Sequence, residues 1–477
     1  MNNIILQISN IIFMLSIGFY LLQNLQWYNY NLLRVIFKHK KIYWHLLYFV
    51  LPLVLFCTLG DIFIFCNIIY LIFLIFWYRK LDKKLVWTSR IYRFFVTYCI
   101  FLAISFVVII SLDTTKYILF VSLFISLLIS YISEIIIIKQ YKKMALEKLD
   151  SMENLTIIAI TASYGKTSIK NFIYALLSKQ FKTYATPRSV NTINGIISDI
   201  NNNLPNDCQI YIVEAGARTK GDIEKISNLI NHHYAVIGEI GEMHLQYFKS
   251  LENIKNTKYE LFKSTRLKEV FLFKDNEIPS DTNIPIRLFP QHISNIYSDL
   301  NGARFDIKLE DKTHHFETKI LGEFNISNLC VAIMIAYKFG ISNIVDLVRN
   351  IKQIEHRLEK IEVNGKIILD DSFNGNLNGM KEAIRLASLH KNGKKIIVTP
   401  GIVENSITNN VKLAILIDEV FDIAIITGEL NSKILAQNIS NAQKIIIKDK
   451  MDLNNILSKF CNDGDLILFA NDAPSYI

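Results

Sequence analysis

Cysteine is scarce in this chain of 477 residues, and its spacing excludes several kinds of protein. The sequence has six cysteines, and no two of them form a C-x-x-C pair. This spacing indicates neither a metal site nor a disulfide framework, and it is typical of a reducing compartment. The chain also lacks visible internal repeats and low-complexity stretches, and its length leaves room for about three domains.

Acidic residues are rare at the start of the chain. The first 150 residues hold 15 Lys or Arg and 6 Asp or Glu, so they carry the whole net charge of +9, and the other 37 basic and 37 acidic residues cancel. The basic residues flank long apolar runs and therefore predict no nucleic-acid surface; we expect anionic membrane lipid as their partner. The first apolar run lacks the basic segment and small-residue cleavage site of a signal peptide, so we expect it to be retained.

The apolar runs predict a membrane region over residues 1–150 with about five transmembrane helices. The candidate spans are about Ile4–Leu22, Tyr43–Leu59, Ile62–Tyr78, Phe94–Ser111 and Tyr117–Ile138. A single re-entrant hairpin at Gly60-Asp61 is the alternative for the second and third spans. The spans hold only Glu134 as a carboxylate at depth, which disfavours a transporter.

The basic residues also predict an orientation in the membrane. Four, six and three of them follow the first, third and fifth spans, whereas the loop after the fourth span holds only Lys116. The positive-inside rule then predicts a multi-pass protein of the inner (cytoplasmic) membrane. Its N-terminus is expected outside and everything after residue 139 in the cytoplasm.

From about residue 151, short apolar strands alternate with amphipathic helices, which indicates an α/β fold with a parallel sheet. The first strands are expected at Leu155–Ile160, Ile210–Glu214, Tyr234–Ile237 and Val270–Phe273, followed by a helix that contains Asn325 to Tyr337. A second set is expected at Lys366–Leu369, Lys395–Val398, Ile423–Ile426, Lys444–Ile447 and Leu466–Phe469. With a hinge at Gly340–Glu355, the pattern predicts a central domain over residues 151–345 and a C-terminal domain over residues 346–477.

A tight loop follows the first of these strands. The segment Thr161-Ala-Ser-Tyr-Gly-Lys-Thr-Ser168 lies between a predicted strand and a predicted helix, an order that binds nucleotide phosphates through amides at the helix start. Lys166 would add a positive charge, and Thr167 a hydroxyl for Mg²⁺. Ile160 stands where a complete Walker motif has its first glycine, so the loop alone is an incomplete signal.

Further polar residues follow the predicted strands, at the sheet edge where α/β proteins bind ligands. Glu214 ends one strand and is placed to reach a phosphate-bound Mg²⁺, although a solvated carboxylate fits equally well. His244 by itself is as compatible with a structural hydrogen bond, and Lys258 with an ordinary surface lysine.

The order of these motifs resembles that of the Mur ligases, ATP-dependent amide-forming enzymes of peptidoglycan precursor synthesis. The details are most similar to the branch that adds D-alanyl-D-alanine to UDP-N-acetylmuramoyl-tripeptide. Besides the loop, the stretches that carry the resemblance are Thr186-Pro-Arg-Ser-Val-Asn-Thr-Ile-Asn-Gly195, Glu214-Ala-Gly-Ala217, Gly221-Asp-Ile223, Ile240-Gly-Glu-Met-His-Leu245, Lys258-Tyr-Glu-Leu-Phe262, Leu321-Gly-Glu-Phe-Asn-Ile-Ser-Asn328, Arg357 and Asp370-Asp-Ser-Phe-Asn-Gly-Asn376. They cover about residues 155–400.

The resemblance implies a central P-loop ATPase domain, a C-terminal Rossmann-like domain and a set of site residues. The implied ATP-binding residues are Ser163, Gly165, Lys166, Thr167, Ser168, Asn325, Asn328, Arg357, Asp371 and Asn374. The implied metal ligands for two Mg²⁺ are Thr167, Glu214, His244 and a Lys258 carbamylated by CO₂. The implied catalytic residues are Lys166, Glu214, His244, Lys258 and Arg357, and the implied acceptor-binding residues are Thr186, Asn191 and Thr192.

The expected activity is therefore that of an acid–amino-acid ligase with an acyl-phosphate intermediate. Three departures limit the substrate assignment: Ala162 and Tyr164 alter the loop, the K-G-S stretch near the C-terminus is missing, and membrane spans replace the N-terminal domain that holds the uridine nucleotide. One alternative is a membrane-anchored ligase with another, lipid-linked carboxylate acceptor. The other is a membrane nucleotide sensor without turnover. The sequence predicts no oligomeric state.

Overall fold

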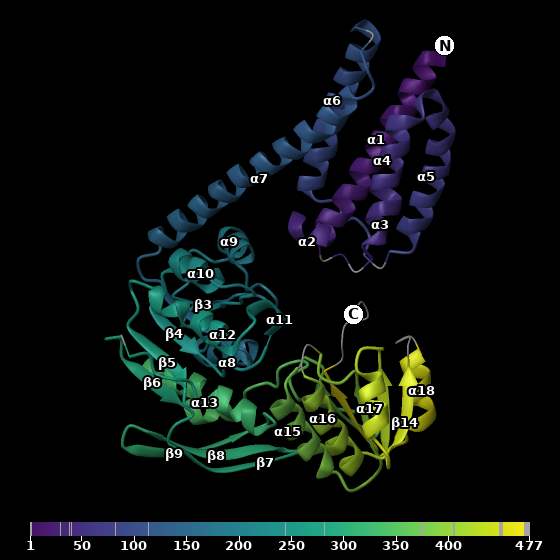
Figure 1. The fold of residues 1–477 in the computed structure, drawn as a ribbon. Coiled ribbons are helices and arrows are strands. Elements are labelled where there is room, and N and C mark those ends of the chain that lie inside the picture. Colours follow the sequence, from purple (N-terminus) through teal and green to yellow (C-terminus); the bar gives the residue numbers. More distant parts are fainter. Residues whose placement is uncertain are drawn as a thin grey trace. The chain divides into compact units, whose positions relative to one another are not determined.

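The computed structural model describes most of the chain. The described residues are 2–28, 30–37, 39, 41–81, 83–112, 114–243, 245–280, 282–373, 375–403, 406–447 and 452–471. They form two compact units, Met1–Gln140 and Tyr141–Ile477, which we call the helical unit and the α/β unit (Figure 1).

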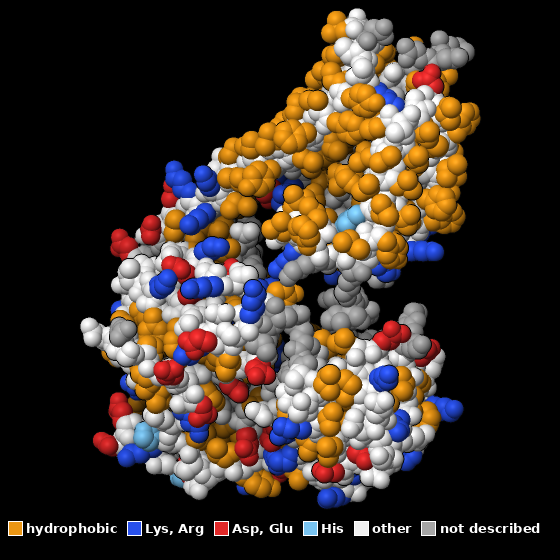
Figure 2. Space-filling model, viewed as in Figure 1, with side chains coloured by type: hydrophobic (Ala, Val, Ile, Leu, Met, Phe, Trp, Pro, Cys, Tyr) orange, Lys and Arg blue, Asp and Glu red, His pale blue; other side chains and the backbone are white. Residues whose placement is uncertain are grey.

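The helical unit consists of apolar helices around an aromatic core. Its elements are α1 (Asn2–Trp27), α2 (Leu32–Phe37), α3 (Tyr43–His45), a π-turn (Leu46–Val50), α4 (Leu51–Thr58), a 3₁₀ turn (Gly60–Ile62), α5 (Phe63–Arg79), α6 (Ser89–Leu112) and α7 (Ile118–Ser151). Phe13, Phe56 and Phe63 are fully buried; the rings of Phe13 and Phe56 stack, and Phe63 packs edge-on against both. Figure 2 shows that hydrophobic side chains cover the visible face of this unit, whereas charges are interspersed over the α/β unit.

The structure has an apolar helix at each of the five predicted spans, and these helices differ in length. Four helices of the described chain are long and apolar enough to cross a membrane by length and composition: Ile4–Trp27, Gly60–Arg79, Ser89–Leu112 and Ile118–Ser151. The predicted second span is a shorter apolar helix, Tyr43–Thr58, about 24 Å long at 1.5 Å per residue. The predicted span Tyr43–Leu59 agrees with this helix to within one residue, because the sequence breaks the apolar run at Gly60-Asp61.

The central part of the α/β unit is built on a six-stranded parallel sheet in the order β2-β3-β1-β4-β5-β6. Its elements are β1 (Thr156–Thr161), α8 (Lys166–Leu177), β2 (Thr183–Ala185), α9 (Ile193–Asn202), β3 (Ile210–Glu214), α10 (Asp222–Ile230), β4 (Tyr234–Ile237), α11 (Leu245–Phe248), α12 (Leu251–Lys258), a 3₁₀ turn (Tyr259–Lys263), β5 (Glu269–Phe273) and β6 (Ile286–Phe289).

Both faces of this sheet are buried, which explains why its strands are apolar throughout rather than alternating. Ile158 and Ile160 face a core with α8 and α13 (Glu323–Lys338), whereas Ile157 and Ala159 face a second core with α9 and α10. The end of α7 joins the second core through Ala145 and Leu149, and the helix ends at Ser151.

An antiparallel sheet of β7 (Ile293–Asp299), β8 (Gly302–Leu309) and β9 (Lys312–Thr318) packs on the first core and was not predicted. The predicted hinge Gly340–Glu355 also needs correction, because it contains α14 (Ile344–Arg349). Val348 of this helix is fully buried in the first core. The segment is therefore a packed part of the central domain rather than an open linker.

The C-terminal part has a second six-stranded sheet in the order β10-β11-β15-β12-β13-β14. Its elements are β10 (Glu359–Val363), β11 (Lys366–Asp371), α15 (Leu377–Ser388), β12 (Lys395–Thr399), α16 (Ile407–Val420), β13 (Ile423–Thr427), α17 (Ser432–Asn438), β14 (Gln443–Ile447), α18 (Leu453–Phe460) and β15 (Leu466–Ala470). All pairs are parallel except β10 with β11. An α/β fold with parallel sheets is thus present, as the sequence indicates.

Candidate active site

The loop between β1 and α8 carries the first predicted site residues. Gly165 precedes α8 with φ 77°, a left-handed conformation that favours glycine. A Cβ atom there would lie 2.6 Å from Oδ1 of Asn328, so the side chain of Asn328 packs directly against the loop. Lys166 folds back onto the loop, where its Nζ donates to the carbonyl oxygens of Ala162 at 2.7 Å and Ser163 at 3.1 Å.

Glu214 ends β3 beside this loop and lies at the centre of a polar cluster. Its side chain is 5% exposed, and its Oε2 accepts a hydrogen bond from Oγ1 of Thr167 at 3.1 Å. Its Oε1 accepts from Nδ2 of Asn191 at 3.3 Å, and its backbone N–H donates to Oγ1 of Thr186 at 3.1 Å. The structure thus brings together four predicted residues from the loop helix, from β3 and from the segment after β2.

Lys170 is a member of this cluster that the sequence analysis missed. Its Nζ lies 3.2 Å from Oε2 of Glu214 and donates to the carbonyl of Thr186 at 2.7 Å, although the lysine side chain is only 3% exposed. Burial raises the pKa of Glu214, but Lys170 and Lys166 outweigh burial and lower it overall. The sequence feature that could have revealed Lys170 is its spacing, since it lies one helical turn after Lys166 on the same face.

Lys258 lies at the end of α12 and is nearly buried, at 4% exposed. Burial, with the positive charge of Lys166 as the next cause, lowers its pKa well below the usual value. This lysine is therefore not the surface lysine that its position alone suggests. His244, predicted as its neighbour at the metals, lies outside the described residues, as does Asn374 of the nucleotide set.

Of the remaining predicted residues, two serines lie at the loop and one threonine lies at the start of α9. Ser163 and Ser168 are buried in the loop and the first turn of α8, and Oγ of Ser163 donates to the carbonyl of Gly241 at 3.0 Å. Thr192 caps α9 by accepting a hydrogen bond from Gly195 N–H at 3.4 Å, so the structure gives it a local structural contact.

Asn325 and Arg357 join the two parts of the α/β unit. Nδ2 of Asn325 donates to the carbonyl of Leu321 at 3.0 Å and to that of Arg357 at 3.2 Å. Burial lowers the pKa of Arg357, whereas the nearby Asp371 and Glu214 raise it. The structure thus places Arg357 within electrostatic range of carboxylates from both parts.

The sequence analysis did not predict two further contacts between the two parts of the α/β unit. The guanidinium of Arg188 lies 4.4 Å from the ring centre of Phe373, and the carbonyl of Phe373 accepts a hydrogen bond from Nη1 of Arg357 at 2.5 Å. The sequence feature that could have revealed these contacts is Arg188 itself, since a large cation stands in the stretch Thr186–Gly195 where the enzymes that the chain resembles have glycine.

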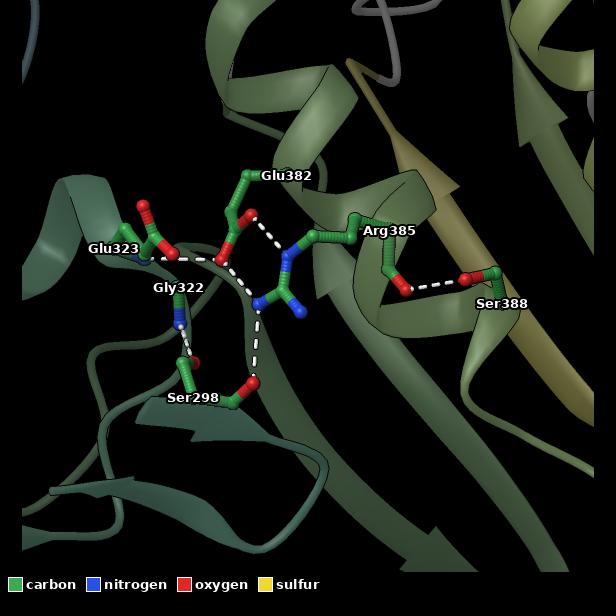
Figure 3. A network of polar contacts seen from close by, with 6 residues as sticks. All are labelled: Ser298, Gly322, Glu323, Glu382, Arg385 and Ser388. Atoms are coloured by element: carbon green, nitrogen blue, oxygen red, sulfur yellow. Dashed lines mark hydrogen bonds and ion pairs between the residues drawn. The ribbon is translucent and has the colours of Figure 1, made fainter. Parts of the chain in front are cut away.

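Figure 3 shows a polar network that also fixes the start of α13. Glu382 of α15 accepts a hydrogen bond from the Glu323 N–H at 3.1 Å, which places a carboxylate at the positive end of that helix. Arg385 pairs with Glu382 at 2.7 Å and donates to the carbonyl of Ser298 at 3.1 Å. Because α13 carries Asn325 and Asn328, this network couples the C-terminal domain to the candidate nucleotide site.

Comparison with known proteins agrees with this geometry. Residues 160–336 match the Mur ligase middle domain family, so the central segment is a Mur ligase middle domain. The chain is 28% identical over 332 residues to the UDP-N-acetylmuramoyl-tripeptide–D-alanyl-D-alanine ligase of Bacillus subtilis. The matched region covers 66% of this chain and 72% of that protein. It is 30% identical over 260 residues to the enzyme of that name from Borreliella burgdorferi, over 50% of this chain and 54% of that protein.

Solved structures show the same fold. The crystal structure of MurF from Acinetobacter baumannii has a TM-score of 0.63 and 21% identity, and covers 70% of this chain and 78% of that one. MurF ligase from Thermotoga maritima, in complex with ADP, has a TM-score of 0.62 and 22% identity, over 70% and 80% of the two chains. These two likenesses show that the chain shares the fold of MurF ligases.

Proposed function

We propose that this protein is an ATP-dependent peptide ligase that joins D-alanyl-D-alanine to UDP-N-acetylmuramoyl-tripeptide through an acyl phosphate. The names of its relatives support the substrates. The observation that carries the reaction class is the cluster of the buried Glu214 and Lys258 with the half-buried Lys166, next to the β1–α8 loop. Together these groups match what phosphoryl transfer requires, namely positive charge for the phosphates and an anionic oxygen for a metal.

The oxygen atoms of this cluster fit Mg²⁺, which proteins commonly hold with one or two carboxylates plus the substrate's phosphates. Thr167 and Glu214 would hold one ion, which would neutralise charge on the migrating phosphoryl group. We propose a second ion held by His244 and a carbamylated Lys258. The lowered pKa of Lys258 supports this, because only a neutral amine reacts with CO₂.

The protein's own residues would then act in two steps. In the first, the loop amides and Lys166 hold the β- and γ-phosphates while the acceptor carboxylate attacks the γ-phosphorus. In the second, the amine of the dipeptide attacks the acyl carbon and phosphate leaves. A Rossmann-like C-terminal domain would close over ATP with Arg357, Asp371 and Asn374 and exclude water from the acyl phosphate.

We also propose that the helical unit is embedded in the inner membrane, with the N-terminus outside and the α/β unit in the cytoplasm. Contacts within the helical unit support five crossings. Gln26 at the end of α1 binds the backbone of Val86, and Tyr117, just before α7, donates to the carbonyl of Cys57 at the end of α4. The segment Tyr43–Thr58 therefore runs from one end of the unit to the other. A reporter after residue 145 should be cytoplasmic and one at Thr114 external; reversed signals would contradict this orientation.

The apolar helices favour one second candidate, a lipid-linked carboxylate acceptor. The deciding experiment incubates the full-length protein with ATP, Mg²⁺, D-alanyl-D-alanine and either acceptor, and reads the products by mass spectrometry. ATP-dependent formation of the pentapeptide from UDP-N-acetylmuramoyl-tripeptide is the expected result. Product from the lipid-linked acceptor alone would replace the substrate assignment, and no product from either would refute the reaction class.

A further inference from the structure

A histidine–aspartate pair lies at the junction between the two parts of the α/β unit. Nδ1 of His356 is 2.7 Å from Oδ2 of Asp370. The other oxygen of Asp370 accepts hydrogen bonds from the N–H of Ser372 at 3.1 Å and from its hydroxyl at 2.7 Å. With both oxygens accepting from donors, the carboxylate is held in one orientation against the imidazole.

The hydrogen bonds assign the proton positions on the imidazole. Because an ionised carboxylate only accepts, Nδ1 of His356 carries the hydrogen that is donated to Asp370. The lone pair of the neutral ring then lies on Nε2, and no hydrogen bond to Nε2 is found among the residues that the structure describes. This is the arrangement in which a carboxylate orients a histidine so that its far nitrogen accepts a proton.

The backbone at His356 supports a functional reason for its position. Its φ is 61°, a left-handed conformation that is uncommon for residues other than glycine, although histidine, asparagine and aspartate adopt it more often than most. Strained backbone of this kind persists where surrounding contacts hold it and is frequent at active sites. Here the carbonyl of His356 accepts a hydrogen bond from Phe373 N–H at 3.3 Å.

A continuous series of contacts connects this pair to the phosphate cluster. The rings of His356 and Phe373 are 5.0 Å apart, and Arg188 stacks on the same Phe373 ring at 4.4 Å. Arg188 belongs to the segment after β2 whose Asn191 binds Glu214. The next residue, Arg357, is within electrostatic range of Glu214 itself. These contacts connect the imidazole, which belongs to the C-terminal part of the α/β unit, with the segment that binds Glu214.

We propose that His356, oriented by Asp370, accepts the proton of the incoming amine in the second step of the reaction. This inference rests on the proposed ligase function. The ammonium of the dipeptide gives one proton to Nε2, and the freed nitrogen lone pair attacks the carbonyl carbon of the acyl phosphate. The C–N bond forms, the C–O bond to phosphate breaks with its electron pair, and the departing phosphate takes the second proton of the nitrogen.

The test separates the two steps with hydroxylamine. Hydroxylamine is largely unprotonated at neutral pH, so it traps the acyl phosphate as a hydroxamate without a base, whereas D-alanyl-D-alanine needs one. The test variants are His356→Asn, chosen because asparagine tolerates positive φ, and Asp370→Asn. The control is His315→Asn, since His315 forms a similar pair with Asp306 at 2.5 Å on the exposed sheet β7–β9.

In the full-length protein, His356→Asn should lower amide formation by roughly 10²-fold and leave hydroxamate formation within about twofold of the wild type. Added imidazole should restore part of the amide formation, and Asp370→Asn should show the same split between the products. His315→Asn should change neither rate. An equal loss of both products, or no loss of either, would overturn the assignment. A wild-type protein that forms neither product would instead refute the proposed function, and this inference with it.

Discussion

The substitution Lys170→Met tests how strongly Lys170 holds the carboxylate of Glu214, which we propose as a metal ligand. Methionine keeps much of the length of the side chain and removes its charge. The ammonium lies 3.2 Å from Oε2 of Glu214, and the two side chains are 3% and 5% exposed. Little solvent is therefore available to replace the lost interaction.

The distance between the ammonium of Lys170 and the carboxylate of Glu214 sets the expected loss of unfolding free energy. At an effective dielectric constant of about 20, two unit charges at this separation attract by about 5 kcal/mol. Removing one partner of a buried pair typically costs about 3–5 kcal/mol, because the other charge remains buried without compensation. We expect Lys170→Met to lower the free energy of unfolding by about that amount at neutral pH.

The loss should depend on pH with a defined sign. In the wild type the pKa of Glu214 is lowered, so its ionised form stabilises the fold above the usual carboxyl range, and that stability is lost as pH falls. Without Lys170, burial should raise the pKa of Glu214. The carboxylate then takes up a proton more readily, and the difference between variant and wild type should narrow toward acidic pH.

The assay is urea-induced unfolding of the purified full-length protein in detergent, followed by far-UV circular dichroism. The double variant Lys170→Met/Glu214→Gln should recover most of the loss, because it removes both charges. Lys182→Met, in the exposed pair of Lys182 with Asp207, is the matched control and should leave the midpoint nearly unchanged. A loss below about 1 kcal/mol, or additive effects in the double variant, would refute the reasoning.

Three other predictions follow from the same structure. Lys166→Ala and Glu214→Ala should each lower kcat for the pentapeptide product by roughly 10²-fold without unfolding the protein, and near-full activity in either would contradict the phosphate-site assignment. Lys258→Ala should be inactive but partly restored by acetate, which supplies a carboxylate in place of the carbamate; full activity without acetate would exclude a metal-ligating Lys258. Burial lowers the pKa of His232 to about 3, so stability should fall as pH drops below about 6.5, by about 2 kcal/mol at pH 5. His232→Leu should remove that part of the pH dependence, and an unchanged slope in thermal melts would argue against it.

The sequence was informative where local chemistry determines structure. The strand before the loop was expected at Leu155–Ile160 and is β1, Thr156–Thr161, because a run of apolar residues buried on both faces leaves little ambiguity. The same holds for Glu214, whose position at the end of an apolar strand places it at the ligand-binding edge of the sheet.

The unpredicted elements depend on contacts between distant residues. Strands β7 and β9 are partly exposed, and they become strands by pairing with β8. Strand β10 likewise exists as the antiparallel neighbour of β11. Helix α14 lies in a segment that reads as a linker, and its burial depends on the core formed by α8 and α13. Local sequence carries no information about such partners.

The site also shows why the net charge of a segment is a poor guide to its ligand. Residues 151–477 hold 37 basic and 37 acidic residues, which would suggest no preference for an anion. Within the cluster, however, Lys166 and Lys170 both lower the pKa of Glu214, and the charge of Lys166 also lowers the pKa of the buried Lys258. Folding thus concentrates positive charge in a poorly solvated place, where electrostatic interactions are stronger than at the surface. A polyphosphate with its metal would restore the balance, so the locally unbalanced charge, more than the composition, argues that this site binds ATP.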